Sequence, residues 1–172
     1  MSTTELLSLL SKATTVQKFD LVTALSNRKE KAVVVAVLEI ANLPVLPDPD
    51  AELELRTLRS QAISTLGTLG DKNVIPFLND KLGSTRVTEQ MAAAYSLGKL
   101  GERSSVSSLI AHADRNNELL SLSIISALGD IGGEEALTYL KTIKMLDNKY
   151  MDAASRAIIS ISESAKKKLV AE

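Results

Sequence analysis

The chain of 172 residues has no cysteine and no tryptophan, and aromatic residues make up only 3% of it. Without cysteine there is no disulfide framework, no thiol nucleophile and no cysteine-ligated metal. With so few aromatic side chains, the core has to be built from Leu, Ile, Val and Ala, which suit closely packed helix pairs. The length allows one domain with a sizeable core.

An excess of charge of one sign is also missing, because 20 Lys and Arg residues face 21 Asp and Glu residues. A nearly neutral chain lacks the positive field that attracts nucleic acids, so we expect no nucleic-acid partner. The basic run Lys166–Lys168 is interpreted as a solvated tail. No apolar run approaches the roughly 18 residues of a membrane span, and Met1–Glu5 has no basic leader. We therefore expect a cytoplasmic protein without membrane contact.

Residues for catalysis are scarce as well. His112 is the only histidine, which leaves no histidine pair for a metal and little basis for a catalytic triad. Asp130, Glu134 and Glu135 are neighbouring carboxylates, but at a helix start they more simply favour the helix dipole. The sequence contains no phosphate-binding Walker loop. It predicts no cofactor, no metal and no catalytic residue, and it favours a non-enzyme without excluding an enzyme.

The sequence does contain a motif that occurs three times. Leu66–Gly70, Leu97–Gly101 and Leu128–Gly132 all read Leu-Gly-x-(Leu/Ile)-Gly, spaced 31 residues apart. A fixed period of this length is typical of repeat solenoids. The final glycine of each motif predicts a helix end, whereas an inner glycine costs about 1 kcal/mol in a helix and suggests close approach of a neighbour. These inner glycines are Gly67, Gly98 and Gly129.

Apolar residues around the motif recur at helical spacing, so each unit is predicted to be a helix, a short turn and a second helix. The equivalent positions are Ala62, Ala93 and Ile124; Ile75, Val106 and Leu137; and Leu78, Leu109 and Leu140.

This pattern resembles the HEAT-like repeats of the phycobilisome (bilin) lyase type, clearly over residues 46–146 and weakly over 147–161. The best copy has the acidic turn Asp48–Asp50, Arg56 or Arg59, Ala62, the Leu-Gly motif, Asp71, and Ile75–Leu78. Later copies replace Pro76 by Ser107 and Thr138, and Arg59 by Gln90 and Ser121. The resemblance implies an all-α fold, a right-handed α-α superhelix or HEAT-like solenoid of antiparallel helix pairs. It also implies that relatives attach or remove bilins on phycobiliproteins, or act in phycobilisome turnover.

Three regions are expected within one continuous solenoid domain: an atypical helical region 1–43, a Pro-rich connector 44–50, and repeats with a C-terminal helix over 51–172. Ser2-x-x-Glu5 and Thr14-x-x-Gln17 have capping-box form and predict two short helices. A third is expected from about Lys29 to Ala41, despite a valine-rich stretch. The connector is interpreted as a long inter-repeat loop or as a functional loop, and Asp50 is expected to cap the helix 51–69.

The second helix of each repeat commonly lines the concave face of such a solenoid, and its equivalent positions stack into ladders. The candidate binding residues are Asn73, Ser104 and Glu135; Phe77, Ser108 and Tyr139; and Lys81 and His112. A competing interpretation is that Phe77 and Tyr139 complete the core and that His112 is a surface or cap residue.

The function favoured by these observations is a non-enzymatic protein-binding scaffold or adaptor. The alternative, implied by the resemblance alone, is a small bilin lyase subunit or phycobilisome turnover factor, in which Tyr139, Tyr95 or Arg103 would help to hold a bilin or its acceptor. Solenoid ends expose apolar faces unless they are capped. We therefore also expect a partner or a second copy to contact Ile158, Ile159 and Ile161.

Overall fold

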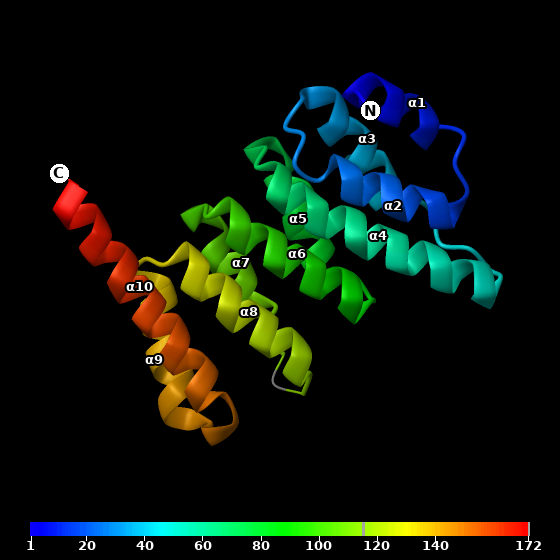
Figure 1. Cartoon of the computed structure of the whole chain (residues 1–172). Helices are drawn as coiled ribbons and strands as arrows, with labels where there is room; N and C mark the ends of the chain where they lie inside the picture. The colour runs from blue at the N-terminus through cyan, green and yellow to red at the C-terminus, as the bar shows by residue number, and fades with distance from the viewer. Residues whose placement is uncertain (115, 172) are drawn as a thin grey trace. The chain divides into compact units, whose positions relative to one another are not determined.

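The computed structural model describes residues 1–114 and 116–171, the side chains of 168–171 excepted. Within these residues it contains ten α-helices, three short 3-10 helices and no strand. The all-α fold expected from the sequence is therefore confirmed (Figure 1). The chain forms two compact units, Met1–Val74 and Ile75–Glu172.

The N-terminal unit consists of α1 (Thr3–Leu10), α2 (Thr15–Leu25), α3 (Lys31–Ala41), α4 (Pro49–Leu69) and the 3-10 turn η1 (Lys72–Val74). Both expected capping boxes form, at Ser2 with Glu5 and at Thr14 with Gln17. The core between the helices is aliphatic. Its members include Val22, Leu25, Val33, Val37, Ala62, Ile63 and Leu66, all with 0% exposure.

The valine-rich segment is helical, as expected, although α3 begins at Lys31, two residues later than predicted. Val33, Val37 and Ala41 lie on its buried face. Packing of this face against α4 outweighs the strand preference of valine, because helix propensity is a weak local term compared with burial.

The expected cap of α4 was wrong by two residues. Asp48, and not Asp50, accepts a hydrogen bond from the Ala51 amide at 2.8 Å, and Pro49 occupies the first helical position. Proline fits there because its missing N–H would have no helical partner anyway. The last two residues of the expected connector therefore belong to α4.

The connector is held by a buried ion pair. Arg59 is only 2% exposed and pairs with Glu52, which lies seven residues earlier on α4. Arg59 also donates to the Pro44 carbonyl at 2.9 Å, and Glu52 accepts from the Leu46 amide at 2.9 Å. These bonds fasten residues 44–46 to α4, which favours the structural interpretation of this loop.

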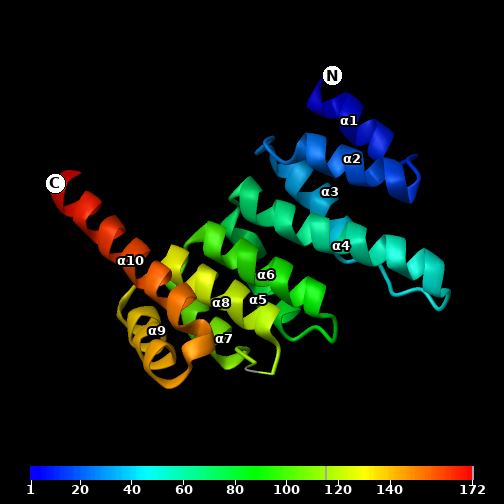
Figure 2. The same ribbon diagram turned by 60° about the horizontal axis from the view of Figure 1, so that its bottom comes forward.

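The C-terminal unit contains α5 (Ile75–Leu82), α6 (Val87–Leu100), η2 (Arg103–Ser105), α7 (Val106–Ala111), α8 (Glu118–Ile131), α9 (Glu134–Leu146), η3 (Asn148–Tyr150) and α10 (Met151–Ala171). In this unit α8 packs between α6 and α10, and α7 contacts both α5 and α9 (Figures 1 and 2). First helices thus form one layer and second helices another. The helix expected over 104–113 is shorter than predicted, since its start is the 3-10 turn η2.

Two inner glycines of the repeated motif, Gly98 and Gly129, permit the close approach that the sequence suggested. A Cβ atom added to Gly98 would lie 2.9 Å from the Cα of Ala127 on the next first helix. One added to Gly129 would lie 2.8 Å from the Cβ of Ala157. Real Cβ atoms are not found at such distances, so only glycine allows α6, α8 and α10 to approach this closely.

Near the C-terminus, Lys166 and Lys167 are exposed on α10, while the side chain of Lys168 and all of Glu172 lie outside the described residues. In the part of the chain that the structure describes, no helix is both long enough and apolar enough to cross a bilayer.

Candidate functional site

Seven of the eight predicted binding residues lie along the second helices of the C-terminal unit. Phe77 and Lys81 are on α5, Ser104 is in η2, Ser108 is on α7 and His112 follows it, and Glu135 and Tyr139 are on α9. We call these seven residues the second-helix ladder. The helices that carry them are neighbours, since α7 contacts α5 and α9. The eighth residue, Asn73, belongs to the N-terminal unit.

The ladder residues make mostly local contacts. The ammonium of Lys81 lies 5.2 Å from the centre of the Phe77 ring on the same helix. His112 contacts the Ser108 carbonyl through Nδ1 at 2.8 Å. Phe77 and Tyr139 are half-buried, so each can serve packing and still be reached from solvent. A role for these residues in binding stays a prediction.

One contact does join two second helices. Ser107 on α7 donates a hydrogen bond to the Glu135 carboxylate on α9 at 2.8 Å. Ser107 occupies the position that is Pro76 in the first copy, so the loss of that proline gives the ladder a hydrogen-bonding group. Glu135 thus links α9 to α7 through its carboxylate.

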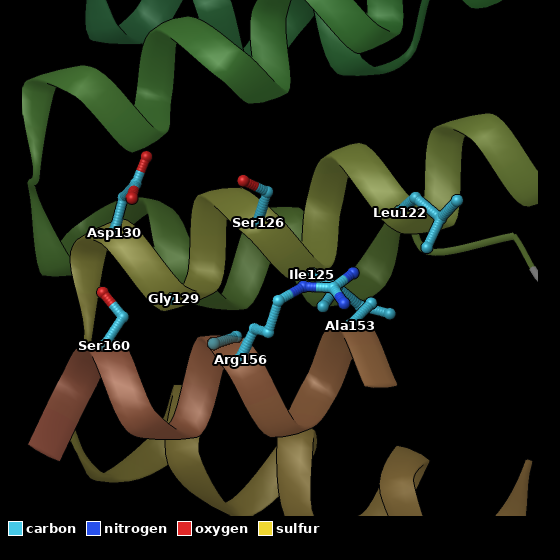
Figure 3. Close-up of a pocket in the computed structure, with 9 residues that line it drawn as sticks. Leu122, Ile125, Ser126, Gly129, Asp130, Ala153, Arg156 and Ser160 are labelled. Carbon is cyan, nitrogen blue, oxygen red and sulfur yellow. The ribbon is translucent and has the colours of Figure 1, made fainter. Parts of the chain in front are cut away.

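Two hollows lie on the first helices of this unit. A groove of about 320 Å³ lies between α6 and α8, and an adjoining one of about 360 Å³ lies between α8 and α10 (Figure 3). Leu122, Ser126 and Asp130 of α8 line both. The first groove, between α6 and α8, is also lined by Met91, Tyr95 and Leu119. The second groove, between α8 and α10, is also lined by Arg156 and Ser160. We call these eight residues the first-helix face.

The first-helix face combines exposed apolar side chains with charged ones. Leu119 is 62% exposed and Tyr95 is 44% exposed, although both side chains are largely apolar. Lys99 lies 5.4 Å from the centre of the Tyr95 ring and 3.9 Å from the Asp130 carboxylate. Exposed apolar side chains gathered in one hollow are typical of protein-interaction sites.

Arg156 adds a positive charge to the second groove. Its side chain lies along the groove between α8 and α10, away from Asp130 (Figure 3). It forms no salt bridge with any residue that the structure describes. An exposed guanidinium of this kind can bind a carboxylate in bidentate fashion.

Of the first-helix face, only Tyr95 and Asp130 were singled out from the sequence, and neither was assigned to a surface on the first helices. The repeated inner glycine was the available signal, because it marks helices that approach closely and leave their flanking side chains at the rim of a groove. Which flanking side chains are exposed could not be read from the sequence. Leu119 and Leu122 differ by one turn of the same helix and belong to the same hydrophobic pattern.

Comparisons with known proteins identify the repeats. The family model of HEAT repeats matches residues 43–121. No curated protein sequence matches the chain. Among solved structures, a chain of the complex of CpcE and CpcF of phycocyanin lyase from Nostoc sp. PCC7120 matches with a TM-score of 0.75 and 20% sequence identity.

That alignment covers 95% of this chain, which spans only 66% of the length of the solved chain. At this level of identity the likeness concerns the fold. It confirms the all-α solenoid of HEAT-like helix pairs that the resemblance of the repeated motif implied. The family model thus identifies HEAT repeats over residues 43–121, and the structural match shows that the described chain has the fold of a HEAT-like solenoid.

Proposed function

We propose that this chain is a non-enzymatic protein–protein interaction scaffold or adaptor, and that it binds its partner on the first-helix face. The observation that carries the proposal is the pair of adjoining grooves over α6, α8 and α10, with Leu119 and Tyr95 exposed at the first groove and Arg156 exposed in the second. An apolar anchor region with a charged rim is the usual composition of a protein-binding surface.

The second-helix ladder is the competing face, and substitutions distinguish the two. Tyr95→Ser with Leu119→Ser removes the apolar anchors of the first-helix face, while Phe77→Ser with Tyr139→Ser removes those of the ladder. Each pair is tested by affinity capture from the source cells, with the retained protein identified by mass spectrometry and its affinity then measured with purified components. We expect the first pair to abolish capture of a defined partner and the second pair to preserve it.

The opposite pattern would assign binding to the ladder. If purified chain captures no protein and instead turns over a small molecule, the scaffold proposal is wrong. Helical content measured by circular dichroism has to be equal for all variants, since loss of folding would remove both faces at once.

A second candidate is a subunit that acts with phycobiliproteins, as a bilin lyase subunit or a turnover factor. It is supported by the fold shared with a chain of the CpcE–CpcF complex of phycocyanin lyase, in which two proteins act together. Tyr95, Tyr139 and the exposed Arg103 would then contact the bilin or its acceptor protein. The test is the absorption spectrum of phycocyanobilin mixed with an apo-phycobiliprotein and this chain, with and without a second lyase subunit. No spectral change in either mixture would reject this candidate.

We also propose that α10 contributes to assembly, with a protein partner or with a second copy. Ile159 is 56% exposed, while Ile158 and Ile161 are half-buried. In α8 the glycine follows Ala127 by two residues, whereas in α10 the residue two places after Ala157 is Ile159. A helix that docks on α10 would therefore contact the Ile159 side chain, whereas α10 itself contacts the bare backbone of Gly129 on α8. Light scattering at several protein concentrations, with Ile159→Lys as the variant, tests this contact; a monomer at every concentration, with unchanged partner binding in the variant, contradicts it.

A further inference from the structure

A separate hollow lies in the N-terminal unit, between α2 and α4. Its volume is about 360 Å³, and its lining is Thr15, Val16, Phe19, Asp20, Leu53, Glu54, Thr57 and Leu58. We call this hollow the α2/α4 groove. It belongs entirely to residues 1–74 and shares no residue with the first-helix face.

The groove exposes apolar side chains that the fold does not cover. Val16 is 65% exposed, Leu53 is 54% exposed and Phe19 is 37% exposed, while Leu58 is almost fully buried at 1%. Burial of the remaining exposed surface of Val16, Phe19 and Leu53 by a partner would be favourable, because it removes apolar area from water. A cluster of three around one hollow is therefore a surface that association would stabilise.

The spacing of the lining residues favours a helix as the occupant. Val16 and Phe19 are three residues apart on α2, and Leu53 and Thr57 are four residues apart on α4. Residues at these separations form ridges along a helix. Two ridges on neighbouring helices leave a furrow between them, into which the apolar stripe of a third helix fits.

The charges at the groove favour a basic partner. Asp20 and Glu54 are the only charged residues among the eight that line it, and both are acidic. Asp50 stands one turn before Glu54 on α4 and is also exposed. The adjoining hollow, which shares Asp20, contains Lys12, so the acidic character is confined to the α2/α4 groove itself.

We propose that the α2/α4 groove binds an amphipathic helix of a partner protein, one whose apolar stripe is flanked by Lys or Arg. The apolar stripe packs on Val16, Phe19 and Leu53, and the flanking cations face Asp20 and Glu54. This interaction goes beyond the proposed scaffold function and does not depend on the first-helix face, because the two surfaces belong to different units.

The probe is a labelled helical peptide of about 14 residues, with Leu at every third and fourth position and Lys on both sides of that stripe. A matched peptide carries Glu in place of Lys. Fluorescence anisotropy measures binding of each peptide to the whole chain. We expect the Lys peptide to bind at least about tenfold more tightly than the Glu peptide, and added salt to reduce the difference.

Two double variants locate the binding. Phe19→Ser with Leu53→Ser is expected to weaken binding of the Lys peptide about tenfold or more, because it removes the apolar anchors. Asp20→Lys with Glu54→Lys is expected to reverse the preference, so that the Glu peptide binds better. All four residues are exposed in the folded chain, so these changes leave the core intact.

The matched controls are Val35→Ser and Glu39→Lys, which alter an exposed apolar and an exposed acidic residue on α3 outside the groove. Unchanged binding in the controls, together with reversal in the charge variant, supports the proposal. Equal binding of both peptides, or equal losses in control and groove variants, overturns it. Self-association that disappears in the Phe19→Ser, Leu53→Ser variant would also overturn it, by identifying a second copy as the occupant.

Discussion

Different interactions stabilise the interior of the N-terminal unit and the interior of the C-terminal unit. In Met1–Val74 polar side chains fix irregular segments, as Arg59 and Glu52 do for the connector and Arg28 does for the chain start through Thr3 at 2.9 Å and the Met1 carbonyl at 2.8 Å. In Ile75–Glu172 successive first helices meet through glycine and alanine, at Gly98 with Ala127 and at Gly129 with Ala157. Regular repetition needs only small residues, whereas irregular segments need specific polar bonds.

One position of the repeat nevertheless has the same role in both units, which is to donate a side-chain hydrogen bond to a carbonyl in the segment before its helix. Arg59 donates to the Pro44 carbonyl, Gln90 to the Leu82 carbonyl at 2.9 Å, and Ser121 to the Asp114 carbonyl at 2.7 Å. The bonded residues are 15, 8 and 7 positions apart in the sequence, so the side chain shortens as the loop shortens. What looks in the sequence like loss of an arginine is an adjustment to loop length.

The largest effect is expected from Arg59→Ala. It removes the guanidinium from the largely buried Glu52 carboxylate and its hydrogen bond from the connector, which should cost about 3–5 kcal/mol of unfolding free energy. Urea denaturation followed by circular dichroism measures the loss, and proteolysis should appear near residues 44–47. Arg56→Ala on the exposed side of the same helix is the control, with a change within about 0.5 kcal/mol. Equal effects of the two would mean that the ion pair does not hold the connector.

The next effect concerns the glycine contacts of the C-terminal unit. In Gly129→Ala the new methyl group collides with Ala157, and such overpacking costs about 1–3 kcal/mol. The higher helix propensity of alanine returns about 1 kcal/mol. We expect net destabilisation in thermal denaturation, and hydrogen exchange that rises in α8 and α10. Ser126→Ala, exposed on the same helix, is the control. A higher melting temperature of Gly129→Ala would contradict the close approach.

Helix capping should act alike in both units. Asp48 caps α4, and Asn117 caps α8 through the Leu120 amide at 3.1 Å. Replacing either by alanine is expected to cost about 1 kcal/mol, because an amide at the helix start loses its acceptor. Asp48→Asn and Asn117→Asp keep an acceptor and should change little. A clear difference between the two alanine variants in urea denaturation would show that one unit depends more on its caps.

The smallest effect is a pH dependence of the N-terminal unit. The pKa of Glu30 lies below its usual 4.5, because the Thr3 hydroxyl donates to the carboxylate, helped by the Glu30 amide and by Arg28. The ionised form is thus favoured by folding, and its contribution is complete above the unfolded pKa and is lost as the pH falls through the folded one. Wild-type chain should therefore lose slightly more stability in acid than Glu30→Gln, as melting curves between about pH 6 and pH 3 would show. Parallel losses would exclude this contribution.

Much of the fold could be predicted because short sequence patterns mark the ends of the helices and the repeats. The Leu-Gly motif, its helix-ending glycine and the capping boxes at Ser2 and Thr14 are each patterns within one or two helical turns, and the motif recurs every 31 residues. The cap of α4 was misplaced because Asp48 and Asp50 are equally good acceptors. Only the turn at Pro49 decides which of the two lies outside the helix.

The candidate surfaces were harder to predict, because exposure depends on which neighbour covers a side chain. Leu119, Leu53 and Val16 look like core residues in the sequence, but each is more than half exposed. Conversely, Arg59 is charged and yet almost completely buried, since the connector folds over it. No local pattern distinguishes these cases.

The sequence alone determined that helix pairs recur, where most helices end, and that neighbouring first helices approach closely at glycine. These features follow from backbone geometry and the spacing of apolar residues, which act over a few residues. Only the tertiary structure decided which side chains line the grooves between α6, α8 and α10 and between α2 and α4. That outcome depends on the relative placement of helices from distant parts of the sequence, within each unit, and no single segment encodes it.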